Sequence, residues 1–335
     1  MTELQGLIDF SAKLNVVFNK PRLPLWKNSS KETREMEDLC RAYDELSSNL
    51  EFSGEPKYFQ IKPYSGENEH VLSMMHQLSH GKGSHIHQVI LQGSLATNEE
   101  IGYSDFDALV VLEEEAFSNV DRLKESISSL WNLYKEIIKQ DILQHHGWFV
   151  TTRKLLKHHL EDFFPAVIFE HSVLIYPASE ASINLNLVKN PSSFLYHLTN
   201  TLNGIEREIS SGQYLKNMYE LKSTLSKFML LPALYMQVKR GHGVYKKDSF
   251  GLVKQEFTEQ EWAVMDYVSL LRKDWIKPDS KILALLALTL PSASRILAKR
   301  FAPSVSNNMR NNLQNKRIEI LKFLRLMQVK VETYI

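Results

Sequence analysis

The sequence predicts an α/β fold of the α+β kind, in which a small mixed sheet with helices spans residues 55–190 and an α-helical domain spans residues 191–335. Before the boundary, short apolar runs rich in β-branched residues alternate with longer segments of helical apolar spacing. Beyond it only helical spacing continues, and Pro191 marks the change. A separate N-terminal helical segment, residues 1–54, precedes the sheet.

The N-terminal segment shows helical spacing twice, at Leu4–Ile8 and at Met36–Leu46. Pro21 and Pro24 separate the two stretches, because proline cannot continue the interior of a helix. We therefore expect two helices that pack on the outside of the sheet domain or of the helical domain and carry no chemistry.

The remaining elements of the sheet domain follow from the same patterns. Residues 54–66 contain glycine, proline and serine and are expected to form a connector. Glu69–Leu78 is expected to form a helix, and Phe117–Lys139 repeats its apolar residues as one helical stripe. Ile183–Leu187 alternates and is expected to be an edge strand or a crossing between the domains.

The sheet domain centres on two apolar runs that flank a group of small and acidic residues. Val89–Leu91 predicts a buried strand, and Ala108–Leu112 predicts a second one. Gly93-Ser94 follows the first strand directly, and Asp105-Phe106-Asp107 leads into the second after ten intervening residues. Because side chains alternate along a strand, we expect both carboxylates on one side, about 6–7 Å apart along the chain.

This arrangement of side chains favours a site for a cation and a phosphate. Asp105 and Asp107 would repel each other unless a cation lies between them. Mg²⁺ is the natural partner, because it takes oxygen ligands and leaves positions open for substrate phosphates. Gly93 permits a close backbone approach, Ser94 offers a hydroxyl, and the amides of the following turn can hold a phosphate.

These residues resemble the signature of the DNA polymerase β-like nucleotidyltransferase superfamily, in which Gly-Ser, a spacer of about ten and Asp-x-Asp on a strand follow one another. Gly93, Ser94, Asp105 and Asp107 match it position by position. The resemblance implies transfer of a nucleoside monophosphate, AMP in preference, from an NTP to a hydroxyl. It also implies that Asp105 and Asp107 bind Mg²⁺, with two ions possible, and that Gly93 and Ser94 contact the nucleotide phosphates.

The resemblance further implies a third carboxylate on a strand after the next helix. Residues 140–150 predict that strand, but its middle holds His145 and His146. Three interpretations remain open. Asp141 supplies the carboxylate from the start of the strand, His145 or His146 acts as the base because imidazole titrates near neutral pH, or Glu170 in a further strand candidate is the third ligand. If none of them serves, the site binds nucleotide without turnover.

The helical domain offers two lysines for the nucleotide. Leu215–Lys239 predicts a core helix that Pro232 should kink or split and that Gly241 should end. Lys247-Asp248 then resembles, more loosely, a motif of adenylylating aminoglycoside nucleotidyltransferases, in which a lysine at a helix start reaches the nucleotide phosphates. An ammonium suits a triphosphate. Lys222, a polar exception on the apolar core helix, is the alternative.

Composition limits the partners and the compartment. The net charge of +1 argues against a long RNA acceptor, so we expect a small-molecule or protein acceptor. The single cysteine, Cys40, fits a reducing compartment, and we expect a cytoplasmic protein without a signal peptide or a membrane span. The oligomeric state is not predicted. A competing hypothesis is a catalytically degenerate nucleotide-binding or protein-interaction module on the same scaffold.

Overall fold

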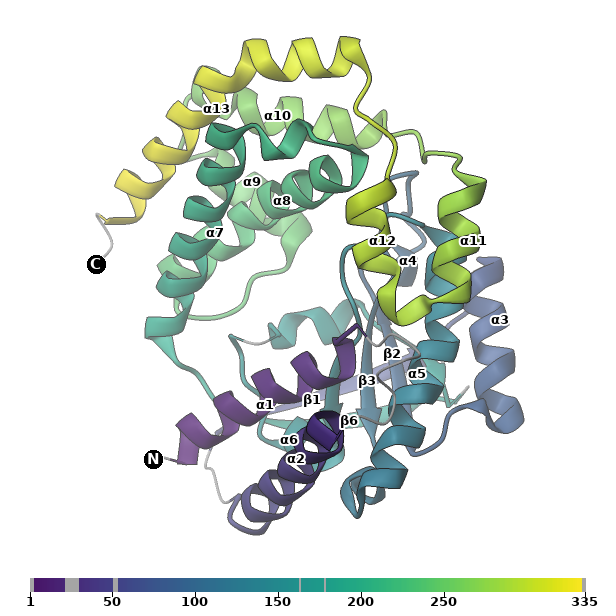
Figure 1. Cartoon of the computed structure of the whole chain (residues 1–335). Coiled ribbons are helices and arrows are strands. Elements are labelled where there is room, and N and C mark those ends of the chain that lie inside the picture. The colour runs from purple at the N-terminus through teal and green to yellow at the C-terminus, as the bar shows by residue number, and fades with distance from the viewer. Residues whose placement is uncertain (1–2, 22–29, 51–53, 163, 178, 333–335) are drawn as a thin grey trace.

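The computed structural model describes residues 3–21, 30–50, 54–162, 164–177 and 179–332, and it has the mixed α/β architecture that the sequence predicts (Figure 1). One six-stranded sheet has the order β4-β3-β2-β5-β1-β6. Its strands are β1 (Glu55–Pro63), β2 (Ile86–Gln92), β3 (Asp107–Leu112), β4 (Phe149–Thr152), β5 (Val173–Tyr176) and β6 (Ala181–Leu187).

The sheet is mixed, as expected. β2 runs antiparallel to both β3 and β5, whereas β3 and β4 are parallel and β1 and β5 are parallel. β6 pairs antiparallel with β1 at one edge, which confirms the edge strand predicted at Ile183–Leu187. The strands predicted at Val89–Leu91 and Ala108–Leu112 lie within β2 and β3, and both are almost entirely buried.

Two predictions about the sheet were wrong. Residues 54–66 do not form a simple connector, because β1 occupies most of them. Its side chains are mostly exposed and it includes prolines, so it lacks the apolar signal of a buried strand. Residues 140–150 do not form one strand either: α5 continues to Gln140, a turn and loop follow, and β4 begins only at Phe149.

Helices from three parts of the chain cover one face of the sheet. The two N-terminal helices, separated as predicted, share one apolar core with the helices on either side of β2 and β3. Pro21 follows the first of them, and Pro24 lies outside the described residues. The other face carries short helices. These elements are α1 (Glu3–Asn19), α2 (Ser30–Ser48), α3 (Glu69–Gln77), η2 (Leu78–Lys82), α4 (Gly93–Ala96), η3 (Glu114–Phe117), α5 (Val120–Gln140), α6 (Arg153–Lys157) and η4 (Ala166–His171).

The C-terminal region is helical and has its own apolar core. Its central helix runs through Pro232 without a break and ends at Gly241, which adopts φ +66° as a left-handed cap. The helices are α7 (Pro191–Ser211), η5 (Gln213–Leu215), α8 (Met218–Arg240), α9 (Lys246–Lys254), α10 (Glu259–Lys273), α11 (Lys281–Thr289), η6 (Pro291–Ala293), α12 (Ser294–Phe301) and α13 (Asn307–Glu332).

The helical hairpin α11–α12 leaves the other C-terminal helices and lies beside α5 (Figure 1). Ala287 of α11 belongs to the core of the sheet domain, and the Arg295 guanidinium donates a hydrogen bond to the Asn19 carbonyl. The two regions therefore share packing beyond the boundary at Pro191. In the described ranges no single helix is long and apolar enough to cross a membrane, and only α11 together with the bent segment Pro291–Phe301 passes that test jointly.

Candidate functional site

Gly93 turns the chain beside the carboxylate of Asp107. The strand β2 ends at Gln92, which lies opposite Asp107 in the β2–β3 ladder, and α4 begins at Gly93. Gly93 adopts φ +68°, a conformation that favours glycine. A Cβ atom at Gly93 would lie 3.3 Å from Asp107 Oδ2. The glycine therefore allows the backbone to approach this carboxylate closely.

Ser94 connects α4 to the loop that leads into β3. Its hydroxyl donates to Ser104 Oγ at 2.8 Å, and Ser104 Oγ in turn accepts from the Ile101 amide at 2.9 Å. The proton of Ser94 is thus used to hold the loop before Asp105. To donate a hydrogen bond to a phosphate, the Ser94 hydroxyl would have to give up its bond to Ser104 Oγ.

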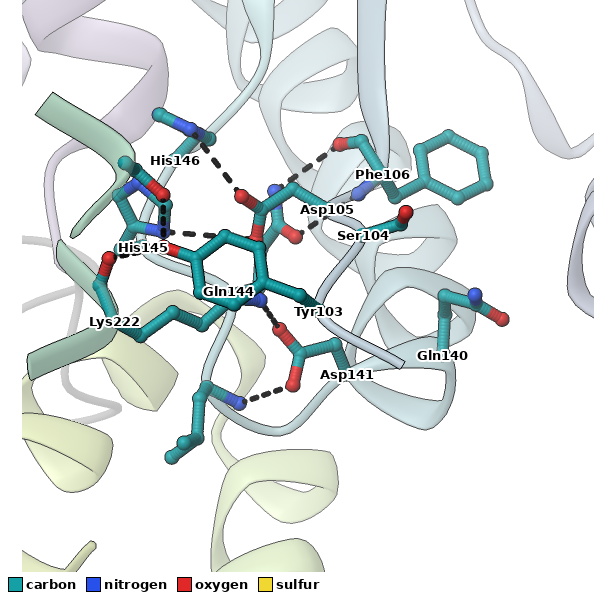
Figure 2. A network of polar contacts seen from close by, with 12 residues as sticks. Tyr103, Ser104, Asp105, Phe106, Gln140, Asp141, Gln144, His145, His146 and Lys222 are labelled. Atoms are coloured by element: carbon teal, nitrogen blue, oxygen red, sulfur yellow. Dashed lines mark hydrogen bonds and ion pairs between the residues drawn. The ribbon is translucent and has the colours of Figure 1, made fainter. Parts of the chain in front are cut away.

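Asp105 belongs to a buried ionic network that reaches across the fold (Figure 2). The ammonium of Lys222, near the N-terminal end of α8, donates to Asp105 Oδ1 at 2.6 Å and also to Asp141 Oδ2. The Lys222 side chain is fully buried, and that of Asp105 is 9% exposed. Burial alone would lower the pKa of Lys222, but Asp105 and Asp141 together raise it above its ordinary value.

Asp141 holds its place at the C-terminal cap of α5, so its position does not follow from strand alternation. Its Oδ1 accepts from the Leu143 amide at 3.0 Å, and this bond shapes the turn after the helix. A carboxylate at the C-terminal end of a helix is disfavoured by the helix dipole. The ammonium of Lys222 offsets that cost. Asp141 thus joins Asp105 in the pairing with Lys222, and it does so from a helix end.

His145 and His146 lie in the loop between α5 and β4. Both imidazoles lie close to the carboxylate of Asp105. His145 Nδ1 is 3.6 Å from Asp105 Oδ1, and His146 Nε2 is 3.8 Å from Asp105 Oδ2. Gln144 fixes the loop, because its side-chain amide both donates to and accepts from the Phe106 backbone at 3.1 Å. The position of both imidazoles is therefore tied to the Asp-x-Asp segment itself.

Burial and neighbouring charges set opposite protonation tendencies on the two aspartates. Burial alone would raise the pKa of Asp105, but His145, Lys222 and His146 hold it well below its usual value. Burial raises the pKa of Asp107, and the charge of Asp105 adds to this, although His146 opposes it. Burial also lowers the pKa of His145 to about 4, so its imidazole is neutral at pH 7.

Two neighbouring lysines at the start of α9 point to different places. Lys247, the predicted nucleotide ligand, is 66% exposed and pairs with Glu99 at 2.5 Å. Burial lowers the pKa of the adjacent Lys246 to about 8, with Arg272 acting in the same direction, while Asp107 and Asp105 partly offset this. Lys246 is thus the lysine whose charge acts on the aspartates. Sequence reasoning missed it, because adjacent helical residues differ by about 100° in direction and nothing in the sequence fixes which one faces inward.

Further cations from the helical region surround the carboxylates. Arg272 of α10 lies over the Tyr103 ring, with its Cζ 4.7 Å from the centroid, and its charge interacts with Asp105. Lys277 donates to the Gln140 carbonyl at 2.7 Å, at the end of α5, and interacts with Asp105 and Asp141. Tyr103 links the loop to α8, since its hydroxyl donates to the Lys222 carbonyl at 2.5 Å.

The site offers ligand atoms for a metal ion in two ways, as one cluster of three side chains and as the single carboxylate of Asp107. In the described part of the chain, Asp105, His145 and His146 form the one group whose ligand atoms all lie within 4.8 Å of one another. The carboxylate of Asp107 takes part in no hydrogen bond or ion pair within the described residues, so its oxygens are available to a cation. The aspartate oxygens fit a hard cation such as Mg²⁺, whereas the imidazoles do not.

Glu170, the remaining candidate for a third ligand, lies elsewhere. It belongs to η4, not to a strand, and its side chain is exposed. Comparisons of the chain with family models, with curated proteins and with solved structures found no match. The function is therefore inferred from the geometry of the site and from the resemblance of the motif.

Proposed function

We propose that the protein is an Mg²⁺-dependent nucleotidyltransferase that moves a nucleoside monophosphate, AMP in preference, from an NTP to a hydroxyl of a small molecule or a protein. The observation that carries the proposal is the carboxylate of Asp107, which has no hydrogen bond or ion pair among the described residues and lies beside the left-handed turn at Gly93. Asp105 and Asp141 supply the further carboxylates that the resemblance implies.

The charges around the site suit an anionic ligand. The site has three carboxylates, those of Asp105, Asp107 and Asp141. Four cationic side chains interact with them: Lys222, Lys246, Arg272 and Lys277. A divalent cation alone would add positive charge to a group in which four cationic side chains already outnumber three carboxylates. We therefore expect the cation and a triphosphate to bind together, each favouring the other.

The chemistry required of the side chains is mainly positioning and charge neutralisation. Mg²⁺, when bound with the triphosphate, supplies Lewis acidity at the α-phosphate. Asp107 and Asp105 would hold the cation, and Lys246 and Arg272 would offset the phosphate charge. The hydroxyl oxygen of the acceptor bonds to the α-phosphorus while the bond to the β-phosphate oxygen breaks. Pyrophosphate leaves, and the hydroxyl proton passes to water.

A second candidate is the catalytically degenerate module, and one observation favours it. The Lys222 ammonium lies between Asp105 and Asp141, where an ion bridging two site carboxylates would be. If this pair persists when nucleotide binds, only Asp107 remains for the metal and transfer fails. Nucleotide binding without turnover is the outcome expected of this candidate.

The test is incubation of the purified protein with each α-labelled NTP, Mg²⁺ and a cell extract, followed by separation of labelled protein, RNA and small molecules. Asp107→Asn is the informative variant, since removing its charge breaks no hydrogen bond or ion pair in the described structure. Asp266→Asn is the control, because the Asp266 side chain lies at an exposed position on α10. Label that depends on Asp107 but not on Asp266 supports transfer and names the acceptor class. No label in any fraction, with an NTP still bound, would favour the degenerate module.

A further inference from the structure

The cluster of Asp105, His145 and His146 contains two histidines that the nucleotidyltransferase proposal does not use. The nearest ligand atoms are 3.6 Å and 3.8 Å apart, from Asp105 to each imidazole, and all three lie within 4.8 Å of one another. Donor atoms around a tetrahedral ion with bonds of about 2.0–2.2 Å are separated by roughly 3.3–3.6 Å. A bound ion would draw these side chains closer together.

The imidazole of His145 lacks the partner that a buried polar atom normally has. Its side chain is 9% exposed, and its Nδ1 has no hydrogen-bond partner among the residues that the structure describes. Buried polar atoms are almost always satisfied, so an exception calls for a ligand or an ion. Nδ1 points to Asp105 at 3.6 Å, beyond hydrogen-bond range, and an ion between them would satisfy both.

The surrounding contacts hold the two histidines in place independently of any ion. The Tyr134 hydroxyl donates to the His146 carbonyl at 2.5 Å, and Gln144 ties the loop to Phe106. The two rings contact each other at a tilt of 45°, with centroids 3.8 Å apart. Lys222 on Asp105 Oδ1 orients the carboxylate, in the way that outer partners orient metal ligands. Oδ2 is left to face His146.

The donor set decides the class of ion. Two imidazole nitrogens and one carboxylate oxygen suit borderline first-row transition metals, whereas Mg²⁺ prefers oxygen ligands throughout. We propose that Asp105, His145 and His146 form a binding site for one divalent first-row transition-metal ion, separate from the Mg²⁺ that a nucleotide brings to Asp107. The proposal concerns binding alone and does not rest on the proposed function.

The test uses Co²⁺ as the probe, because its visible absorption reports on its ligands. The full-length protein is stripped with a chelator and titrated with Co²⁺ or with Mg²⁺, by calorimetry and by absorption. We expect one Co²⁺ per chain, bound at least about tenfold more tightly than Mg²⁺. His146→Phe keeps an aromatic ring near Phe149 and should weaken Co²⁺ by at least about tenfold.

The matched control is His87→Phe. His87 also faces a carboxylate, Glu113, and is 30% exposed against 32% for His146. Equal loss of Co²⁺ in both variants, an unchanged affinity in His146→Phe, or Mg²⁺ binding as tight as Co²⁺ would overturn the proposal. X-ray absorption of the Co²⁺-loaded wild type provides a test without any variant, since two imidazole ligands are expected and none would refute the site. Asp107→Asn should keep Co²⁺ binding whether or not transfer is observed, so the two proposals can fail separately.

Discussion

Asp105 and Asp107 are two residues apart in one motif, yet their surroundings differ. Asp105 is bound by a buried lysine from α8 and approached by two histidines, whereas Asp107 has no such partner in the described structure and lies beside the Gly93 turn. The contrast teaches that one motif can combine a structural carboxylate with one left available to a ligand. Five predictions test or sharpen this division.

The largest effect is expected from the network around Asp105. Lys222→Met leaves Asp105 and Asp141 buried without their counter-ion, so we expect a loss of about 3–5 kcal/mol in the free energy of unfolding, measured by urea denaturation. Lys227→Met, on the same helix, removes a partly exposed pair with Glu208 and should cost less than about 1 kcal/mol. Equal losses in the two variants would contradict the division of roles.

The stability loss in Lys222→Met should depend on the charges of Asp105 and Asp141, which the variant leaves without a counter-ion. Combining Lys222→Met with Asp105→Asn and Asp141→Asn removes the whole charge group, and we expect the triple variant to regain most of the lost stability. A triple variant that is less stable than Lys222→Met alone would show that the hydrogen bonds of these side chains, and not their charges, hold the structure.

Acid should weaken the sheet domain through a residue outside the network. Burial lowers the pKa of His159 to about 4, and its Nε2 donates to the Phe164 carbonyl. The unfolded chain therefore binds the extra proton first, so stability is complete above about pH 6.5 and falls, by up to about 3 kcal/mol, as pH drops toward 4. His159→Gln should flatten the slope of urea stability between pH 7 and pH 5. Parallel slopes would show that His159 is not the titrating group.

The effect of the Gly93 turn on ligand binding can be separated from the effect of backbone strain on stability. Gly93→Ala and Gly241→Ala both place a side chain at positive φ and should each cost about 1–2 kcal/mol. Only at Gly93 does the new Cβ meet a site carboxylate, whereas nothing lies within 4 Å at Gly241. Measured by calorimetry, Mg²⁺ and nucleotide binding should weaken in Gly93→Ala and stay unchanged in Gly241→Ala. Equal binding in both would remove Gly93 from the site.

The smallest change compares the adjacent lysines. Lys246→Met should weaken nucleotide binding by about tenfold, because a hydrogen bond to a charged group contributes about 1.5–3 kcal/mol. Lys247→Met should change it less than about twofold, since Lys247 is exposed and paired with Glu99. Fluorescence titration with a labelled nucleotide measures both. A larger loss of binding in Lys247→Met than in Lys246→Met would show that Lys247, the residue favoured by the sequence, is the nucleotide ligand.

The sequence predicted the fold well where apolar periodicity was strong. The strands around Gly93 and the Asp-x-Asp segment, the two N-terminal helices and the Gly241 cap are confirmed. It failed at β1, whose exposed face lacks an apolar signal, and at residues 140–150, where Asp141 ends a helix.

The candidate site was predictable only in part. The sequence singled out Asp105, Asp141 and Lys222 one by one, but their joining depends on where the C-terminal end of α5 lies relative to α8, which no local pattern encodes. For the same reason, the choice between Lys246 and Lys247 required the fold. The grouping of His145 and His146 with Asp105 required the loop that Gln144 fixes.

The most direct measurement is calorimetric titration of wild type and Asp107→Asn with a non-hydrolysable ATP analogue and Mg²⁺, with melting curves recorded on both proteins. The division of roles predicts that the wild type binds the analogue only with Mg²⁺, and that Asp107→Asn loses this binding while its melting temperature is not lowered. Binding that persists unchanged in Asp107→Asn, or no binding to the wild type at all, would contradict it.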